Sequence, residues 1–216
     1  MIYEYAHGGT KPIATLYDEG NSPNGCAVDP SSGNLAVAGG GLSNANFAIY
    51  QNAQGTPTVY KDGSAERFTF CTYDSNGNLF AGGSVLIELP NGSSSFVGIP
   101  VQGIHEFAAP GIQWDGSYIA LQGTADSKKG PGTIYQIQVF GSTATVVNEV
   151  NLTDRINKNP YLGAQFWIGD GTIVNPESTN RNVGLWRYPQ GGKAYHTVKA
   201  SEKGGLIYAV TVSRAP

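Results

Sequence analysis

The sequence predicts an all-β chain built from repeated antiparallel hairpins, and three observations support this prediction. Gly accounts for 30 of the 216 residues, roughly twice its usual share, as in chains with many tight turns. Charged residues make up only 13%, about half of the ordinary ~25%. A strand, a turn and a second strand recur along the chain, with Asp29, Asp74, Asp115 and Asp170 at the turn. The recurrence of this unit at intervals of several tens of residues indicates a repeat fold.

Each repeat contains four expected strands, named a to d in chain order. The a and b strands flank the recurring Asp turn, in residues 25–40, 70–83, 111–123 and 164–175. The c and d strands alternate apolar residues around a Gly-containing turn, in residues 47–60, 86–99, 134–147 and 185–198. Alternation on both sides of a Gly turn is typical of a β-hairpin. Residues 2–16 form one more c–d hairpin, and residues 206–213 form a last a strand.

Four antiparallel strands at this period are typical of a β-propeller, in which neighbouring blades bury each other's apolar faces. We therefore expect one domain over residues 1–216, with blades at approximately 24–61, 68–99, 111–149 and 163–199. Residues 205–213 and 2–17 would join the two termini in an incomplete closing blade, giving a small ring of about five four-stranded blades. The alternative is a fragment of a six- or seven-bladed propeller. A closed ring predicts a monomer, whereas an open ring predicts an oligomer that shields its strand edges.

Residues 23–39 resemble the NHL-type and SMP-30/gluconolactonase-like propeller repeat. The residues that carry the resemblance are a G-x-A-V-D strand from Gly25 to Asp29 and a G-N-L-x-V-A strand from Gly33 to Ala38. The resemblance covers nearly the whole chain as architecture, and it implies an exported bacterial protein, periplasmic or extracellular. The N-terminal residues do not show the basic and apolar regions of a signal peptide. The residues themselves therefore do not predict a compartment.

Polar loops gather on one expected face of the ring. In a propeller the d–a and b–c loops emerge together around the mouth of the central channel, and here these loops carry more than half of the 16 acidic residues. Loops on a rigid scaffold commonly carry function. We expect a non-catalytic binding module that presents this face to a small polar ligand or a protein. The expected face contains Asp18, Asn24, Asp62, Glu66, Arg67, Asp154, Arg155 and Tyr161.

A metal-assisted hydrolase is the alternative function, so whether the chain is an enzyme stays open. The resemblance implies it, because SMP-30-like lactonases hold a divalent cation, often Ca²⁺, which polarises the lactone carbonyl or activates water. Acyl-homoserine or sugar lactones would be the substrates. His105 would act as the general base beside Glu106. The nearest candidate metal ligands are Asn24, Glu66, Glu106 and Asp154.

Charge and residue patterns exclude other classes. The formal net charge of −3 gives no basic footprint for nucleic acid, and no run of 18 apolar residues predicts a membrane span. The four turn aspartates are expected to cap their own backbone turns. Cys26 and Cys71 occupy equivalent positions on adjacent blades, too far apart for a disulfide, and are expected to be small buried hydrophobic residues.

Overall fold

The fold is all-β, as predicted. The computed structural model describes residues 1–18, 22–41, 44–62, 68–83, 85–104, 111–123, 132–153, 165–177, 181–199 and 207–213, and of residues 40, 41, 44, 45 and 62 it describes only the main chain. Within these segments the chain forms nineteen β-strands and one short 3-10 helix, η1 (Gln51–Ala53). In the part of the chain so described, no helix is long and apolar enough to cross a bilayer.

Four sets of four consecutive antiparallel strands, here called blades 1 to 4, make up most of the structure, and blades 3 and 4 belong to one nine-stranded sheet. Blade 1 consists of β3 (Pro23–Val28), β4 (Leu35–Gly41), β5 (Asn44–Tyr50) and β6 (Thr58–Asp62). Blade 2 consists of β7 (Phe68–Tyr73), β8 (Leu79–Gly83), β9 (Leu86–Leu89) and β10 (Val97–Gly98). Blade 3 consists of β12 (Ile112–Trp114), β13 (Ile119–Gln122), β14 (Thr133–Phe140) and β15 (Thr143–Thr153). Blade 4 consists of β16 (Trp167–Gly169), β17 (Thr172–Glu177), β18 (Asn182–Arg187) and β19 (Gly191–Lys199).

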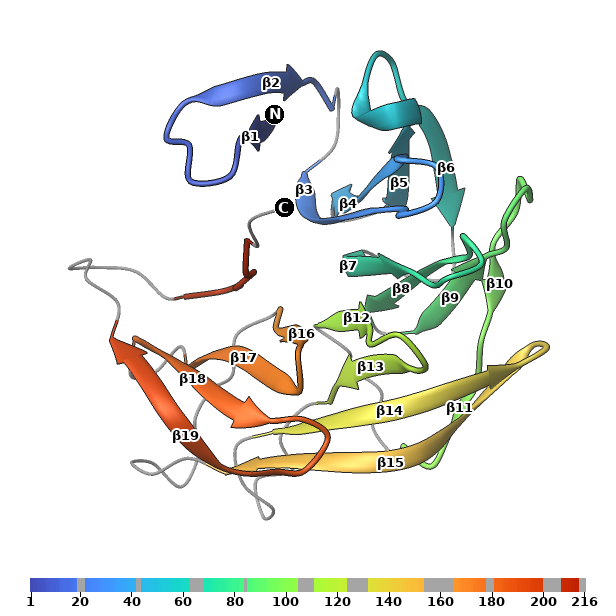
Figure 1. Ribbon diagram of the computed structural model, residues 1–216. Coiled ribbons are helices and arrows are strands. Elements are labelled where there is room, and N and C mark those ends of the chain that lie inside the picture. Colours follow the sequence, from blue (N-terminus) through green and yellow to red (C-terminus); the bar gives the residue numbers. More distant parts are fainter. Residues whose placement is uncertain are drawn as a thin grey trace.

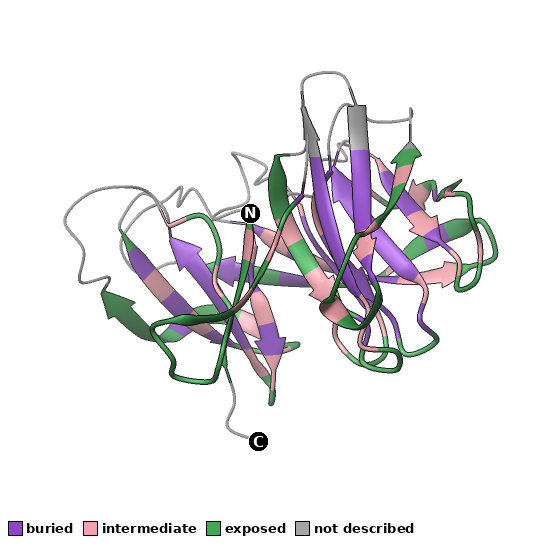
Figure 2. Ribbon diagram, turned by 90° about the horizontal axis from the view of Figure 1, so that it is seen from above, coloured by how far each residue is buried: buried purple, intermediate pink, exposed green. Residues whose placement is uncertain are grey.

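The blades surround a common centre, with β3, β7, β12 and β16 innermost (Figure 1). A separate N-terminal hairpin, β1 (Ile2–Tyr5) and β2 (Pro12–Leu16), lies beside blade 1. The second strands of blades 2 and 3, β8 and β13, are buried along their whole length, because each has a neighbouring blade on both faces. Across the molecule, buried residues lie in the strands and exposed residues in the turns (Figure 2). This arrangement of repeated four-stranded sheets confirms the predicted fold class of a small propeller.

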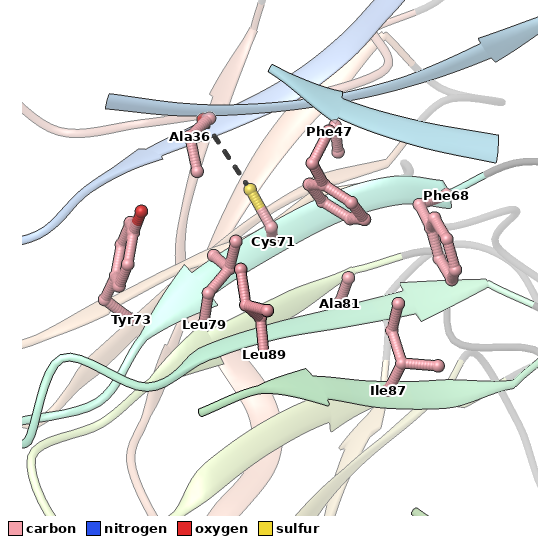
Figure 3. Close-up of a cluster of buried hydrophobic side chains, with 10 residues drawn as sticks. Ala36, Phe47, Phe68, Cys71, Tyr73, Leu79, Ala81, Ile87 and Leu89 are labelled. Atoms are coloured by element: carbon pink, nitrogen blue, oxygen red, sulfur yellow. Dashed lines mark hydrogen bonds between the residues drawn. The ribbon is translucent and has the colours of Figure 1, made fainter. Parts of the chain in front are cut away.

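Apolar side chains fill the space between successive blades. Between blades 1 and 2, Phe47 and Phe68 stack with ring centroids 5.1 Å apart, and the Sγ of Cys71 contacts the carbonyl oxygen of Ala36 at 3.8 Å (Figure 3). Similar buried clusters lie between blades 2 and 3 and between blades 3 and 4. Each blade therefore depends on its neighbours for burial, as the repeat pattern predicts.

The outer strands of blades 2, 3 and 4 are joined by short parallel ladders. The connecting strand β11 (Val101–Gln102) pairs with β15, and β15 pairs with β19 through Leu152 opposite Gly192 and Thr153 opposite Lys193. These ladders occupy sheet edges that would otherwise present unpaired main-chain groups.

The two ends of the chain approach each other near the gap between blades 4 and 1. Ile2 and Leu16 of the N-terminal hairpin pack against the buried cluster on the outer part of blade 1. The C-terminal segment 207–213 forms two main-chain hydrogen bonds with Gln165, at 3.1 and 3.2 Å. Nδ1 of His7 lies 2.5 Å from Oγ of Ser213. Among the described residues, segment 207–213 forms no ladder with β1, and the side chains of Ser213 and His7 connect it to the N-terminal hairpin.

The two cysteines differ, and the expectation for Cys26 was wrong. Both thiols are free, and Cys71 is buried as expected, whereas Cys26 is exposed. Cys71 faces blade 1, but Cys26 lies on the opposite side of blade 1, where the inner strand β3 is uncovered and the neighbouring Val28 is 57% exposed. The repeat therefore places the two residues equivalently without giving them equivalent surroundings.

Candidate functional site

Three of the four turn aspartates, Asp29, Asp74 and Asp115, cap their own turns as predicted, while the same expectation for Asp170 stays a prediction. Oδ1 of Asp29 accepts hydrogen bonds from the amide and hydroxyl groups of Ser31 at 2.9 and 2.8 Å, and Oδ2 accepts one from the Ser32 hydroxyl at 2.5 Å. Oδ1 of Asp74 accepts from the amides of Asn76 and Asn78 at 2.8 and 2.9 Å. Burial raises the pKa of Asp29, but its hydrogen bonds outweigh burial, so the pKa lies below its ordinary value. These carboxylates have structural roles.

Asp115 has a wider role, because its carboxylate also joins two blades. Its Oδ1 accepts from the amides of Ser117 and Tyr118, at 2.8 and 2.7 Å. Its Oδ2 accepts from Nε2 of Gln136 at 2.8 Å and from the phenol of Tyr188 on the neighbouring blade. Burial, followed by the hydrogen bond and charge of Asp115, raises the pKa of Tyr188 far above its ordinary value. The Tyr188 phenol therefore stays protonated and donates.

Side-chain hydrogen bonds connect the innermost strands of successive blades. Nδ2 of Asn24 donates to the carbonyl oxygen of Phe68 at 3.0 Å, linking blades 1 and 2. Oγ1 of Thr72 accepts from the amide of Trp114 at 2.8 Å, linking blades 2 and 3. Asn24 was predicted as a ligand of the loop face, and the structure shows its amide nitrogen engaged in this link.

Two glutamines form the link between blades 3 and 4. The Gln113 side chain donates to the carbonyl oxygen of Ile168 and accepts from its amide, both at 2.7 Å. The Gln165 side chain pairs in the same way with Ile112, at 2.9 and 3.0 Å. Each amide reproduces the donor and acceptor of a strand residue, so the pair acts as a ladder between β12 and β16. Sequence reasoning did not single out either glutamine.

Most predicted site residues lie outside the described segments. Asp18 is described and buried. The burial of Tyr50, followed by the negative charge of Asp18, raises the pKa of the Tyr50 phenol. Asp62 is described in its main chain only. The predicted residues outside the described segments are Glu66, Arg67, His105, Glu106, Asp154, Arg155 and Tyr161. The ligand face, the His105–Glu106 pair and three of the four metal ligands therefore remain predictions.

A different set of polar residues is buried at the loop end, which is the end of each blade that carries the b–c connection. These residues are Asn46, Gln122, Asn175, Glu177 and Asn182. Sequence reasoning counted Glu177 among the acidic residues of the loop face but did not single out the other four, because they lie within or at the end of strands that are mostly apolar. Both polar atoms of the Asn175 side chain and Oε1 of Gln122 are buried and have no hydrogen-bond partner within the described residues. Leaving such groups unpaired is unfavourable, which makes this cluster the candidate functional site.

Within the described residues, no group of three or more His, Cys, Asp or Glu side chains could hold a metal ion. Of the predicted metal ligands, only Asn24 has a described side chain, and its amide nitrogen is engaged with Phe68. One remaining amide oxygen does not make a site for a divalent cation, which requires several oxygen donors. The metal site therefore stays a prediction.

No protein-family model matches the chain, and no curated protein matches it in sequence. Solved structures match its fold. Glutaminyl cyclase from Myxococcus xanthus aligns with a TM-score of 0.55 and 11% identity, over 83% of this chain and 71% of that one. A chain of a nidogen/laminin complex aligns with a TM-score of 0.54 and 10% identity, over 86% and 82% of the two chains. Sqt1 from Saccharomyces cerevisiae aligns with a TM-score of 0.51 and 12% identity, over 85% and 50%.

These likenesses, at such low identity, bear on the fold alone, and they agree with the four blades in placing the chain among β-propeller-like proteins. No sequence match supports the NHL-type or SMP-30-like resemblance, so that finer assignment remains a prediction. The fold does not specify an activity, because propellers carry many unrelated functions.

Proposed function

We propose that this protein is a β-propeller binding module that holds a small polar ligand at its loop end. One observation carries the proposal, namely the contrast between the two ends of the blades. At the opposite end, which carries the Asp turns, the buried carboxylates of Asp29 and Asp74 have hydrogen-bond partners within their own turns. At the loop end, the buried side chains of Gln122 and Asn175 have polar atoms without a hydrogen-bond partner among the described residues.

The polar groups at the loop end are buried, which favours a small ligand over a protein partner. A protein would be recognised mainly by exposed side chains, with a central buried anchor and a polar rim. Small-molecule sites are concave and place a few polar groups among apolar ones. Gln122 is 2% exposed and Asn175 is fully buried, and both extend strands of apolar residues.

The test is to map binding by NMR chemical-shift changes on the uniformly labelled protein. The probes are glycerol, xylitol, glucono-1,5-lactone and an acyl-homoserine lactone, each with and without Ca²⁺. We expect saturable shifts at the loop end, around Asn46, Gln122 and Asn175, and unchanged signals around the turn aspartates Asp29 and Asp74. No saturable shift with any probe, or shifts only at the turn aspartates, would contradict the proposal.

The same samples test the alternative of a metal-assisted lactone hydrolase. Its motivation is the sequence resemblance, with His105 and Glu106 as the catalytic pair and Glu66 and Asp154 among the metal ligands. Lactone hydrolysis that requires Ca²⁺ and is abolished in Glu106→Gln would replace the binding proposal with an enzymatic one. A lactone that binds and stays intact would support a binding module.

A further inference from the structure

The interface between blades 3 and 4 contains polar residues at the positions where the other interfaces are apolar. The positions can be compared by counting from one b-strand residue of each blade that packs on the same face. In blades 2, 3 and 4 this is the residue that packs against the preceding blade, namely Leu79, Ile119 and Ile173, and in blade 1 it is Leu35. Two residues further along stand Val37, Ala81, Leu121 and Asn175. Four residues further along stand Gly39, Gly83, Gly123 and Glu177. Only in blade 4 are both positions polar.

Asn175 and Glu177 face blade 3. Side chains two residues apart on a strand share a face, and Ile173 belongs to the buried cluster between blades 3 and 4. Asn182 joins them, because it pairs directly with Glu177 across the β17–β18 ladder. All three residues are buried, and Asn175 and Glu177 are both 0% exposed.

Gln122 faces the same space from blade 3. It follows Ala120 by two residues on β13, and Ala120 belongs to the same buried cluster as Ile173. In blades 1 and 2 the corresponding residues, which also face the next blade along the chain, are Ala38 and Gly82. At the matching level the first interface therefore opposes Ala38 to Ala81, whereas the third opposes Gln122 to Asn175.

Blade 4 also has room for a side chain where two other blades have none. A Cβ added at Gly39 would lie 2.9 Å from the carbonyl oxygen of Ser22, and one added at Gly123 would lie 2.4 Å from the ring of Tyr135. Glu177 occupies the equivalent position in blade 4. The cross-strand neighbour of Asn175 is Gly184, and the ring of Trp186 covers the space beside Gly184.

We infer that Gln122, Asn175, Glu177 and Asn182 form a ligand niche between blades 3 and 4, and that its ligand is a small neutral molecule with neighbouring hydroxyl groups. This inference rests on the proposed binding function, and it places the ligand site between two blades and away from the ring axis. The repeat folds with apolar or Gly residues at the positions of Gln122, Asn175 and Glu177 in the other blades, so folding does not require polar residues there. Binding sites commonly retain groups that are unfavourable for stability.

The chemistry of the unpaired atoms selects the ligand class. Nδ2 of Asn175 requires an acceptor, while Oδ1 of Asn175 and Oε1 of Gln122 require donors. A hydroxyl group donates and accepts at once, so two neighbouring hydroxyls can satisfy all three atoms. A metal ion would leave Nδ2 of Asn175 unpaired, and an anion would lie beside the Glu177 carboxyl group. Both are therefore disfavoured relative to a neutral polyol.

The first experiment measures thermal unfolding of Asn175→Val, which installs the residue found at position 37 of blade 1. Removing two unpaired buried atoms should raise Tm by about 2–4 °C or more in a domain of this size. Asn175→Ala, which installs the residue of position 81, serves as the second variant in case valine does not fit. A lower Tm in both variants would overturn the inference, because it would mean that the amide is already satisfied within the fold.

The second experiment measures binding of glycerol, erythritol and xylitol by ligand-detected NMR, with 1-propanol as the probe that lacks neighbouring hydroxyls. We expect at least one polyol to bind saturably and 1-propanol not to bind, with Kd weakened roughly 10-fold or more in Asn175→Ala. The matched control is Val37→Ala, which changes the equivalent position in blade 1 and should leave polyol binding unchanged. Binding equal to wild type in Asn175→Ala, or no polyol binding, would overturn the niche.

The outcomes separate this inference from the wider proposal. If a polyol shifts loop-end signals but binds Asn175→Ala as tightly as wild type, the niche is wrong and the binding function stands. If no probe produces a saturable shift at the loop end, the binding function itself fails.

Discussion

Replacing Gln113 with alanine should lower the free energy of unfolding by about 2–4 kcal/mol. The side chain makes two hydrogen bonds to the main chain of Ile168 in the next blade, both at 2.7 Å. Each such bond contributes roughly 0.5–1.5 kcal/mol net. The substitution also leaves the amide and carbonyl of Ile168 without these partners at a site that is largely buried, and unpaired buried groups add to the loss.

The assay is equilibrium unfolding in urea, applied to Gln113→Ala, Gln165→Ala and the double variant. Both glutamines join the same two inner strands, β12 and β16, so loss of one link should weaken the other. We expect the two single effects not to add, with a coupling free energy of about 0.5 kcal/mol or more, as found for residues in one network.

Gln138→Ala is the matched control, because this half-buried strand residue makes no side-chain hydrogen bond within the described residues of blade 3. Its effect should stay within about 0.5 kcal/mol of wild type. The reasoning would be refuted if Gln113→Ala were as stable as this control, or if the effects of the two glutamine substitutions were strictly additive.

Three further predictions concern titratable groups. Asp29→Asn should lower stability at neutral pH, and the difference from wild type should vanish as pH falls through the depressed pKa of Asp29, as acid titrations of unfolding will show. Tyr188→Phe should cost about 1–3 kcal/mol in urea unfolding by removing the hydrogen bond to Asp115. Because the folded state raises the pKa of Tyr188, this contribution is complete below the ordinary tyrosine pKa of about 10 and is lost above it; equal losses at pH 7 and pH 11 would argue against the assignment. A thiol reagent should modify Cys26 in the folded protein, slowly because desolvation raises its pKa, and Cys71 only on unfolding; modification of both at one rate would disagree with the packing.

Local chemistry and periodicity made the fold predictable from the sequence. Asp followed by small polar residues predicts a capped turn without reference to tertiary structure, and Asp29 and Asp74 confirm it. Hairpins with alternating apolar residues predict blades, because such sheets must bury one another. The surroundings of Cys26 were not predictable from the repeat, since they depend on what covers the side of blade 1 that faces away from blade 2.

The candidate site was harder to predict, because it depends on which face each residue takes. The Asp turn between paired residues spans two residues in blade 4, Asp170 and Gly171, and four in blade 3, residues 115–118. Because of that difference, counting residues from the Asp turn does not align the b strands correctly. It does not show that Asn175 of blade 4 stands at the position equivalent to Ala81 of blade 2. A comparison by strand pairing is required, and pairing is a property of the folded chain.

The parallel ladders at the outer edge have a consequence for how the ring opens. Blades 3 and 4 are joined at their inner strands by two glutamine pairs and at their outer strands by the β15–β19 ladder, so they should exchange amide hydrogens as one cooperative unit. Among the described residues, two main-chain hydrogen bonds join the C-terminal segment 207–213 to Gln165. Sub-global opening should therefore start at that point and leave blades 3 and 4 as the slowest-exchanging part of the molecule, so the proposed niche would lie in its most persistent region.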